Sequence, residues 1–248
     1  ILQVVTEEYI PFEKNFIALM ESNSNFSREN IYLLCLDTKS EREIAQMGFG
    51  CVPVADTWED NLGFVWKLRV RVLSCLVKAG HSVILSDNDA LWLKDPMLDI
   101  DVPEVRGSSI VASRGSFPDS VGSVWGSTLC MGFIFFHADK GVDIIVTNME
   151  RLVMKIGDDQ EAINFTLNNL GIDWDTSSDM RYIFSTNYGK GIMSNLGEGV
   201  LKVTLLPHDQ YTRRCDKVPI GSNTTVAHCL SGKHGLSKIG WMKRCKLW

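Results

Sequence analysis

The sequence lacks three features that would each have pointed to a function class: a long apolar run, an excess of basic residues and closely spaced cysteine pairs. A membrane-spanning helix needs about 18 consecutive apolar residues, whereas the longest comparable stretch, Cys130–Phe136, has the length of a strand. The 25 Lys and Arg residues are outnumbered by 30 Asp and Glu residues, which argues against a nucleic-acid or acidic-membrane partner. Without a Cys-x-x-Cys pair, the seven cysteines do not indicate a structural zinc site.

The composition is typical of one globular domain. The chain has 248 residues, of which 45% are apolar and 22% charged, and no repeat or linker divides it. It begins in strand-like residues, Ile1–Val5, without an initiator Met or a signal-like segment. We therefore expect a trimmed single domain, with any membrane anchor or targeting segment of the parent protein outside this sequence.

The cysteines have two kinds of surroundings. Cys35 and Cys75 lie inside apolar runs, where we expect them to be buried as small hydrophobic residues. Cys215, Cys229 and Cys245 cluster late in the chain in more polar sequence, where a disulfide can form that the sequence does not assign. The odd total leaves at least one thiol free.

Three glycosylation sequons bear on the cellular compartment. Asn25 and Asn223 begin sequons in loop-like sequence, as an attached glycan requires, whereas the sequon at Asn164 lies within a predicted helix and is expected to be buried. These sequons favour a glycoprotein of the secretory pathway, and we expect the Golgi lumen.

Short apolar runs alternate with segments of helical period. In the first third, the predicted elements are strand Leu2–Thr6, helix Pro11–Glu21, strand Ile31–Leu36, helix Ser40–Met47, strand Cys51–Val54, helix Phe64–Lys78 and strand Val83–Leu85. The later ones are strands Ile110–Ser113, Gly132–His137 and Val200–Leu206, and helices Gly141–Ile156 and Asp159–Leu170. Continuous apolar strands separated by helices are typical of a parallel sheet covered on both faces. We predict a single α/β domain of Rossmann-like type, with a mostly parallel central sheet flanked by helices.

The end of the Val83–Leu85 strand carries the strongest chemical signal. There Asp87-Asn88-Asp89 places two carboxylates two residues apart, and on extended chain they can face the same side. Open α/β sheets bind ligands at the carboxyl ends of their strands, and carboxylate oxygens suit Mg²⁺ or Mn²⁺. A metal ion at this position would neutralise a diphosphate leaving group.

The same triplet has other interpretations. An Asp-x-Asp triplet arises about once by chance at this Asp content, so a plain surface turn competes with a metal site. Two further triplets begin at Asp99 and Asp173; they follow no predicted strand and are interpreted as loop or cap carboxylates. An EF-hand is excluded, because Leu91 and Trp92 stand where an oxygen ligand and a glycine are required.

Several segments together match a known pattern. They are Trp66-Lys67-Leu68-Arg69, Asp87-Asn88-Asp89-Ala90-Leu91-Trp92-Leu93-Lys94-Asp95-Pro96, Gly132-Phe133-Ile134-Phe135-Phe136, Asp159-Gln160 with Asn164, His228, and Gly235-Leu236-Ser237-Lys238. In order and spacing, over nearly the whole chain, they resemble the nucleotide-diphospho-sugar transferase family that includes the plant rhamnogalacturonan xylosyltransferases. More distantly, the pattern is similar to glycogenin-type retaining transferases.

The resemblance implies a GT-A fold and a single glycosyltransferase catalytic domain over 1–248, with a nucleotide-binding half at 1–96 and an acceptor and catalytic half at 97–248. It implies metal-dependent transfer of a hexosyl or pentosyl unit, with Mn²⁺ or Mg²⁺, from a UDP-sugar donor to a hydroxyl of a glycan or glycoprotein, with retention of anomeric configuration. Inverting transfer would need a positioned carboxylate base, for which the sequence offers no further candidate.

The resemblance also implies roles for individual residues. Asp87, Asp89 and His228 match the metal ligands, and Asp159 and Gln160 match the catalytic pair beside the donor sugar. The donor-binding residues that it implies are Thr6, Lys67, Asn88, Gly235 and Lys238.

These residues have ordinary structural interpretations as well. They are a core imidazole for His228, a solvated charge for Lys67 and Lys238, helix capping for Asp158 beside Asp159, and core packing for Trp92. The chain also departs from the family pattern, since Cys130 stands where many relatives have Asn and His228 precedes Gly235 by more than the glycogenin-type spacing.

Two other function classes compete. The alternative function is a catalytically inactive GT-A-like domain that binds nucleotide or carbohydrate. A nucleotidyltransferase is disfavoured, because the turn Thr6–Tyr9 after the first strand has two acids and no glycine for a phosphate-binding loop.

Overall fold

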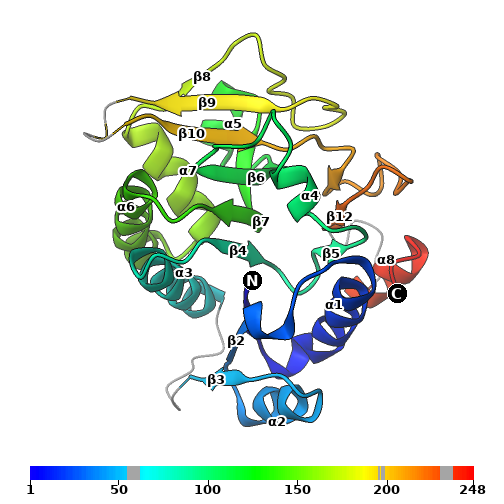
Figure 1. Ribbon diagram of the computed structural model, residues 1–248. Helices are drawn as coiled ribbons and strands as arrows, with labels where there is room; N and C mark the ends of the chain where they lie inside the picture. Colours follow the sequence, from blue (N-terminus) through cyan, green and yellow to red (C-terminus); the bar gives the residue numbers. More distant parts are fainter. Residues whose placement is uncertain (55–61, 195, 197–198, 230–236) are drawn as a thin grey trace.

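A nine-stranded sheet forms the centre of the computed structural model, which describes residues 1–54, 62–194, 196, 199–229 and 237–248 (Figure 1). From one edge to the other, the strands are β3 (Cys51–Pro53), β2 (Tyr32–Cys35), β1 (Leu2–Val5), β4 (Val83–Ser86), β7 (Thr128–Phe136), β6 (Ile110–Gly115), β10 (Leu201–Leu205), β9 (Gly189–Met193) and β8 (Asp173–Trp174). A separate three-stranded sheet consists of β11 (Tyr211–Thr212), β12 (Val226–Ala227) and β5 (Leu91–Trp92).

The large sheet is parallel in its first half and mixed in its second. Strands β3, β2, β1 and β4 run parallel to one another. Strand β7 lies antiparallel between β4 and β6, and β10 is parallel to β6 but antiparallel to β9. The predicted α/β class with a mostly parallel sheet is therefore confirmed, and the reversed strands are a refinement of it, because an apolar run does not encode its direction.

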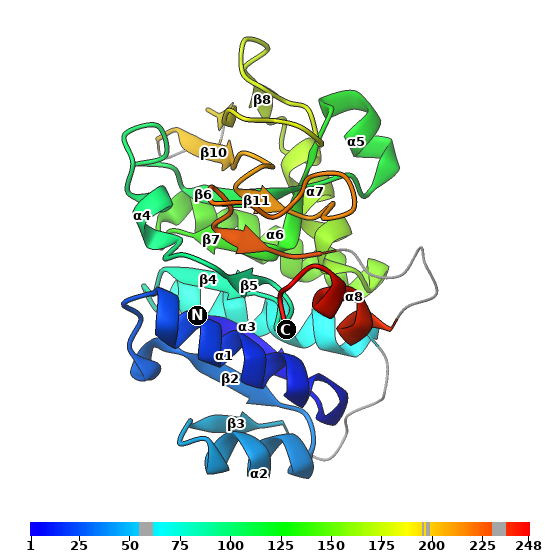
Figure 2. The ribbon, with the colours of Figure 1, turned by 90° about the vertical axis from the view of Figure 1, so that its right-hand side faces the viewer.

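Helices cover both faces of this sheet (Figures 1 and 2). One face carries α3 (Leu62–Lys78), α6 (Lys140–Ile156) and α7 (Asp159–Asn169), and the other carries α1 (Ile10–Asn23), α8 (Lys238–Arg244) and the small sheet. The remaining helical elements are η1 (Glu7–Tyr9), η2 (Arg28–Asn30), α2 (Thr38–Gln46), α4 (Met97–Ile100) and α5 (Asp119–Trp125). No helix within the described residues is both long and apolar enough to cross a lipid bilayer.

Alternate side chains of the central strands enter two separate cores, as the two-residue period of a strand requires. On β4, Ile84 packs on the α1 side, whereas Val83 and Leu85 pack on the α3 and α6 side. The α1 core is centred on Trp92, which is fully buried and meets the Phe16 ring edge-on at 5.6 Å between centroids. The expectation that Trp92 is a core residue is confirmed.

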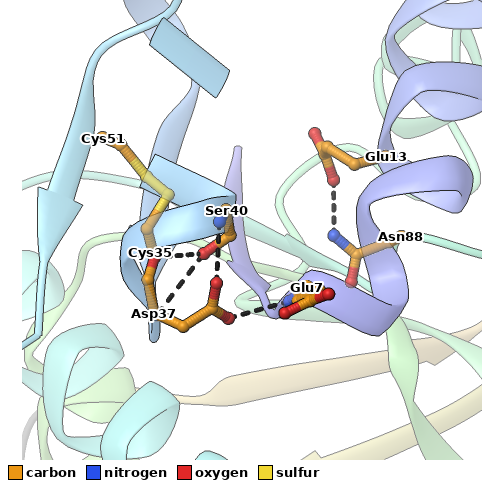
Figure 3. Close-up of a disulfide and its surroundings, with 7 residues drawn as sticks. All are labelled: Glu7, Glu13, Cys35, Asp37, Ser40, Cys51 and Asn88. Atoms are coloured by element: carbon orange, nitrogen blue, oxygen red, sulfur yellow. Dashed lines mark hydrogen bonds between the residues drawn. A yellow bond between two sulfur atoms is a disulfide. The ribbon is translucent and has the colours of Figure 1, made fainter. Parts of the chain in front are cut away.

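Two disulfides revise what the sequence predicted for the cysteines. Cys35 is buried as expected, but it is bonded to Cys51 and so links β2 to β3 (Figure 3). The expected burial of Cys75 is wrong: its side chain is exposed, because it lies two positions from the buried Leu73 and therefore on the other side of α3. Of the late cysteines, Cys215 and Cys229 form the second disulfide.

The two further Asp-x-Asp triplets have different outcomes. Asp173 lies in β8 and not in a loop, although Asp175 does cap a turn by accepting from the Ser177 amide. Asp99 lies in α4 and not in a loop, and it accepts hydrogen bonds from Tyr211 Oη at 2.9 Å and from Thr225 Oγ1 at 2.6 Å. It thereby fastens α4 to the small sheet.

Among the sequons, Asn25 and Asn223 are exposed and lie outside helices and strands. Asn164 is fully buried, as expected, and its side-chain amide exchanges hydrogen bonds with the backbone of Leu129 in β7.

Candidate active site

The carboxyl ends of three parallel strands meet at one edge of the large sheet. Thr6 directly follows β1, Asp37 lies just after β2, and Asp87 directly follows β4. All three line a cavity of about 920 Å³. This is the edge at which open α/β sheets bind their ligands, and it is where the sequence predicted the metal and diphosphate to lie.

The small sheet brings a distant imidazole to this edge. Strand β12 pairs antiparallel with β5, so that Ala227 lies opposite Leu91. Because β5 begins just after Asp89, the next residue of the other strand, His228, lies beside the two carboxylates. The His228 amide donates to the Thr212 carbonyl of β11 at 2.9 Å, which extends the pairing by one residue.

Asp87, Asp89 and His228 form a cluster whose ligand atoms all lie within 4.8 Å of one another. His228 Nε2 is 3.5 Å from Asp87 Oδ2 and 3.5 Å from Asp89 Oδ2. Two carboxylates and an imidazole are ligands that Mn²⁺ and Mg²⁺ accept, so the residues present fit a divalent cation.

Gly132 of β7 gives His228 its space. A Cβ atom at position 132 would lie 2.0 Å from His228 Cε1 and 2.2 Å from His228 Nδ1, far inside any contact distance. The glycine in the Gly-aromatic strand is thus a requirement of the cluster.

The ionisation of the cluster is set by opposing effects. Burial opposes the charge on Asp89, but His228 and Lys238 outweigh it and lower the pKa of this carboxyl below its usual range. Burial likewise lowers the pKa of His228, and Asp89 reverses this to raise the pKa to about 9. Lys238 Nζ lies 2.6 Å from Asp89 Oδ2 and over the ring of Tyr9.

Arg69 of α3 joins the cluster to α7. Its guanidinium donates to Asp87 Oδ1 at 2.6 Å and also to Asp159 Oδ2, and its side chain is only 10% exposed. Burial raises the pKa of Asp159, and the Arg69 charge counteracts this only in part. Asp158 caps α7, as predicted, by accepting from the Glu161 amide.

A second cavity of about 370 Å³ adjoins the first and holds the α7 residues Asp159 and Gln160. Both cavities are bordered by Trp66, Arg69, Asp87, Arg213 and His228. Gln160 Nε2 donates to the Phe117 carbonyl at 2.7 Å. Cys130, also in the wall, has its Sγ 3.9 Å from His228 Nδ1; burial would raise the pKa of this thiol, but Arg213 and His228 lower it to about 7.

The structure thus brings together most of the residues singled out in the sequence. Thr6, Asn88 and Lys238 line the first cavity, with Asp87, Asp89 and His228. Asn88 is fixed from behind, because its Nδ2 donates to the fully buried Glu13 of α1 (Figure 3). Lys67 lines neither cavity, and Gly235 lies outside the described residues.

Two arginines in these walls, Arg69 and Arg213, were not predicted. Arg69 did have a signal: it belongs to the buried stripe of α3 with Val70, Leu73 and Val77, and a cation on an apolar face needs a partner. Lys67, two positions away, lies on another side of the helix. Arg213 follows a two-residue strand, and nothing around it in the sequence marks it.

Comparisons with known proteins bear on the family and the fold of this chain. The family model described as nucleotide-diphospho-sugar transferase matches residues 27–228. The glycosyltransferase GlyE of Streptococcus pneumoniae TIGR4 is a similar solved structure, with a TM-score of 0.55 and 14% identity over 97% of this chain; the chain spans only 58% of the length of GlyE. The galactosyltransferase LgtC, solved with donor and acceptor sugar analogs, has a TM-score of 0.52 and 12% identity over 99% of this chain and 93% of LgtC. These likenesses confirm the predicted GT-A fold. The comparison with curated proteins gave no match.

Proposed function

The chain belongs to the nucleotide-diphospho-sugar transferase family, and we propose that it is a retaining glycosyltransferase that moves a hexosyl or pentosyl unit from a UDP-sugar to a hydroxyl of a glycan or glycoprotein. The observation that carries the proposal is the Asp87, Asp89 and His228 cluster, which lies in a large cavity and borders a smaller one through Asp87 and His228. A donor and an acceptor need two adjoining spaces, and the diphosphate needs a cation at their junction.

Asp87, Asp89 and His228 would hold Mn²⁺ or Mg²⁺. When bound, such an ion neutralises charge on the diphosphate and so makes it a better leaving group. Asp89 is already ionised at neutral pH, since the pKa of its carboxyl is lowered. His228 must release its proton before it can serve as a ligand.

The two cavities favour the division of the domain into a nucleotide-binding half, 1–96, and an acceptor half, 97–248. Most residues around the larger cavity come from the first half, including Thr6 and Asn88, which we propose as donor-binding residues. Most residues around the smaller one come from the second half. We propose that Lys238, which lines the larger cavity, contacts the diphosphate.

We propose that transfer proceeds with retention in the following way. The bond between the anomeric carbon and the β-phosphate oxygen breaks, and its electron pair stays on the phosphate. The acceptor hydroxyl then bonds to the same carbon from the same face, and its proton passes to a phosphate oxygen. Asp159 is held by Arg69 and is not placed to act as a free general base, so we propose that Asp159 and Gln160 stabilise the positive charge on the sugar ring.

Release of UDP from UDP-sugars in the presence of Mn²⁺ tests the proposal. We expect slow release from at least one UDP-sugar, which Asp89→Asn abolishes. Asp101→Asn is the matched control, because the Asp101 side chain is 75% exposed and, among the residues that the structure describes, pairs with Arg106 alone. No release from any UDP-sugar would favour the non-catalytic binding function.

A thermal-shift series tests the donor base. We expect UDP with Mn²⁺ to raise the melting temperature, because a ligand that binds only the folded state stabilises it, and we expect UDP without metal to do so much less. If GDP or CDP stabilised the protein and UDP did not, the assignment of a UDP-sugar would be wrong.

We also propose that the protein works in the Golgi lumen. Two disulfides favour an oxidising compartment, and two sequons are exposed. Protein from secretory cells should gain mobility after enzymatic removal of N-glycans, and the double variant Asn25→Gln, Asn223→Gln should not.

A further inference from the structure

Arg213 is a cation in the cavity walls, and among the described residues no carboxylate forms an ion pair with it. Its Nη1 donates to Gln160 Oε1 at 3.5 Å, a long bond to a neutral group, and its Nε is buried without any hydrogen-bond partner. A buried N–H group left unpaired costs about 1–3 kcal/mol. Because this group lies beside two cavities, a bound ligand could supply the acceptor that its N–H lacks.

The other two described cations around the larger cavity are already engaged. Arg69 bridges Asp87 and Asp159, and Lys238 pairs with Asp89. Arg213 borders both cavities, as do Asp87 and His228. Its guanidinium therefore lies between the space proposed for the donor and the space proposed for the acceptor, where Cys130, Asp87 and Asp89 act on its charge without pairing with it.

The fold fixes the position of Arg213 relative to His228. Arg213 follows β11 and His228 follows β12, and these two strands are paired in parallel, with Thr212 opposite Ala227. Two residues after Arg213, Cys215 forms a disulfide with Cys229, the residue next to His228. A cation held so firmly beside a metal ligand is preorganised for an anionic group at that point.

We propose that Arg213 binds the β-phosphate of the donor and stabilises the negative charge that this phosphate gains during transfer. The inference rests on the proposed function and deepens it. As the bond between the anomeric carbon and the phosphate oxygen breaks, the electron pair adds one negative charge to the nucleoside diphosphate. Arg213 can take up that charge alongside Lys238, since a guanidinium carries five donors in a fork that suits phosphate oxygens.

Arg213→Ala is the main test. We expect turnover of the UDP-sugar to fall about 100- to 1,000-fold, the loss typical when one donor to a developing charge is removed, while the KM for the donor changes less than tenfold. Calorimetry with Mn²⁺ should show UDP binding at least tenfold weaker, with UMP binding unchanged because UMP lacks the β-phosphate. Arg214→Ala is the matched control, because the neighbouring Arg214 lines neither cavity and pairs with Asp216.

Arg213→Gln and Arg213→Lys keep the test decisive if the alanine variant folds poorly. Glutamine keeps a hydrogen-bond donor without the charge, and we expect it to be as inactive as alanine. Lysine keeps the charge without the fork, and we expect partial activity. Equal UDP affinity and equal turnover in the glutamine variant and the unchanged protein would overturn the inference.

Hydrolysis of the donor by water distinguishes a role of Arg213 at the leaving group from a role at the acceptor, because water replaces the acceptor in this reaction. If Arg213 binds the leaving phosphate, its removal slows hydrolysis and transfer by the same factor. If only transfer slows and the KM for the acceptor rises, Arg213 binds an acidic acceptor and the inference is wrong. If the unchanged protein binds no nucleoside diphosphate with Mn²⁺, the proposed function itself fails.

Discussion

Substituting Gly132 by alanine tests the metal site through a residue that is not itself a ligand. The added Cβ would lie 2.0 Å from His228 Cε1, and ordinary contact begins at 3.4 Å, so the ring must move by about 1.4 Å. Metal–ligand distances tolerate only about 0.2 Å. The variant therefore loses the imidazole as a ligand, and we expect Mn²⁺ affinity to fall by at least the 10- to 100-fold that disturbed outer-shell partners cause.

Titration calorimetry with Mn²⁺ measures this loss. Gly50→Ala is the matched control, since a Cβ at position 50 meets nothing within 4 Å. Because β7 is central, the melting temperature of metal-free Gly132→Ala shows whether it still folds. His228→Ala removes the clash with the ring and leaves only the contact of the Cβ with Asp87 Oδ2 at 3.0 Å, so adding Gly132→Ala to it should cost much less affinity than Gly132→Ala costs in the unchanged protein. Unchanged Mn²⁺ affinity in a folded Gly132→Ala variant would refute the assignment of His228 as a ligand.

Three further predictions concern ionisation and the small sheet. Burial lowers the pKa of His228, but Asp89 raises it to about 9, so Mn²⁺ must displace a proton from the imidazole when it binds. We therefore expect the affinity for Mn²⁺, measured by calorimetry, to rise about tenfold per pH unit from pH 7 towards 9 and then to level off. Burial raises the pKa of Glu13 to about 7, against the hydrogen bond from Asn88; the folded state therefore holds this proton more tightly, and about 3 kcal/mol of stability is lost between pH 4.5 and 7. Urea unfolding of Glu13→Gln should lack that slope, and an unchanged slope would contradict this assignment. Asp99→Ala leaves two hydroxyl groups without their acceptor and should cost about 2–4 kcal/mol of unfolding free energy, together with weaker Mn²⁺ binding, whereas a loss below 1 kcal/mol would show that the small sheet does not depend on it.

Long periodic elements were predictable from the sequence, and short or glycine-rich ones were not. The helix predicted at Phe64–Lys78 is α3, Leu62–Lys78, because many turns repeat the same apolar stripe. Strand β9 was missed, since glycines 189 and 191 occupy two of its three buried positions. A Cβ at position 191 would lie 2.7 Å from the Trp174 ring, so the glycine there makes room for a tryptophan, which no apolar pattern reveals.

At the site, the sequence predicted the residues that directly follow a single apolar strand. Asp87 and Asp89 follow a strand that is apolar throughout, and a parallel sheet sends such ends to one edge. The prediction of Lys67 came from the resemblance, whereas the structure engages Arg69, which belongs to the buried stripe of α3. An exposed basic side chain and one that is buried against carboxylates lie on different faces of a helix. The helical period of the sequence predicts which face each residue occupies.

The contributions of Arg213 and His228 depend on pairings that no local pattern encodes. Strands β11 and β12 are two residues long, too short for any period, and their position is set by pairing with β5, by the disulfide between Cys215 and Cys229, and by Asp99. Loop closure over such long separations costs entropy that two residue pairs of backbone pairing do not repay, so the disulfide and the partly buried hydrogen bonds of Asp99 must supply the remainder. The site is therefore completed by long-range contacts. Variants that loosen the small sheet should lower the affinity of the site for Mn²⁺ before they unfold the large sheet.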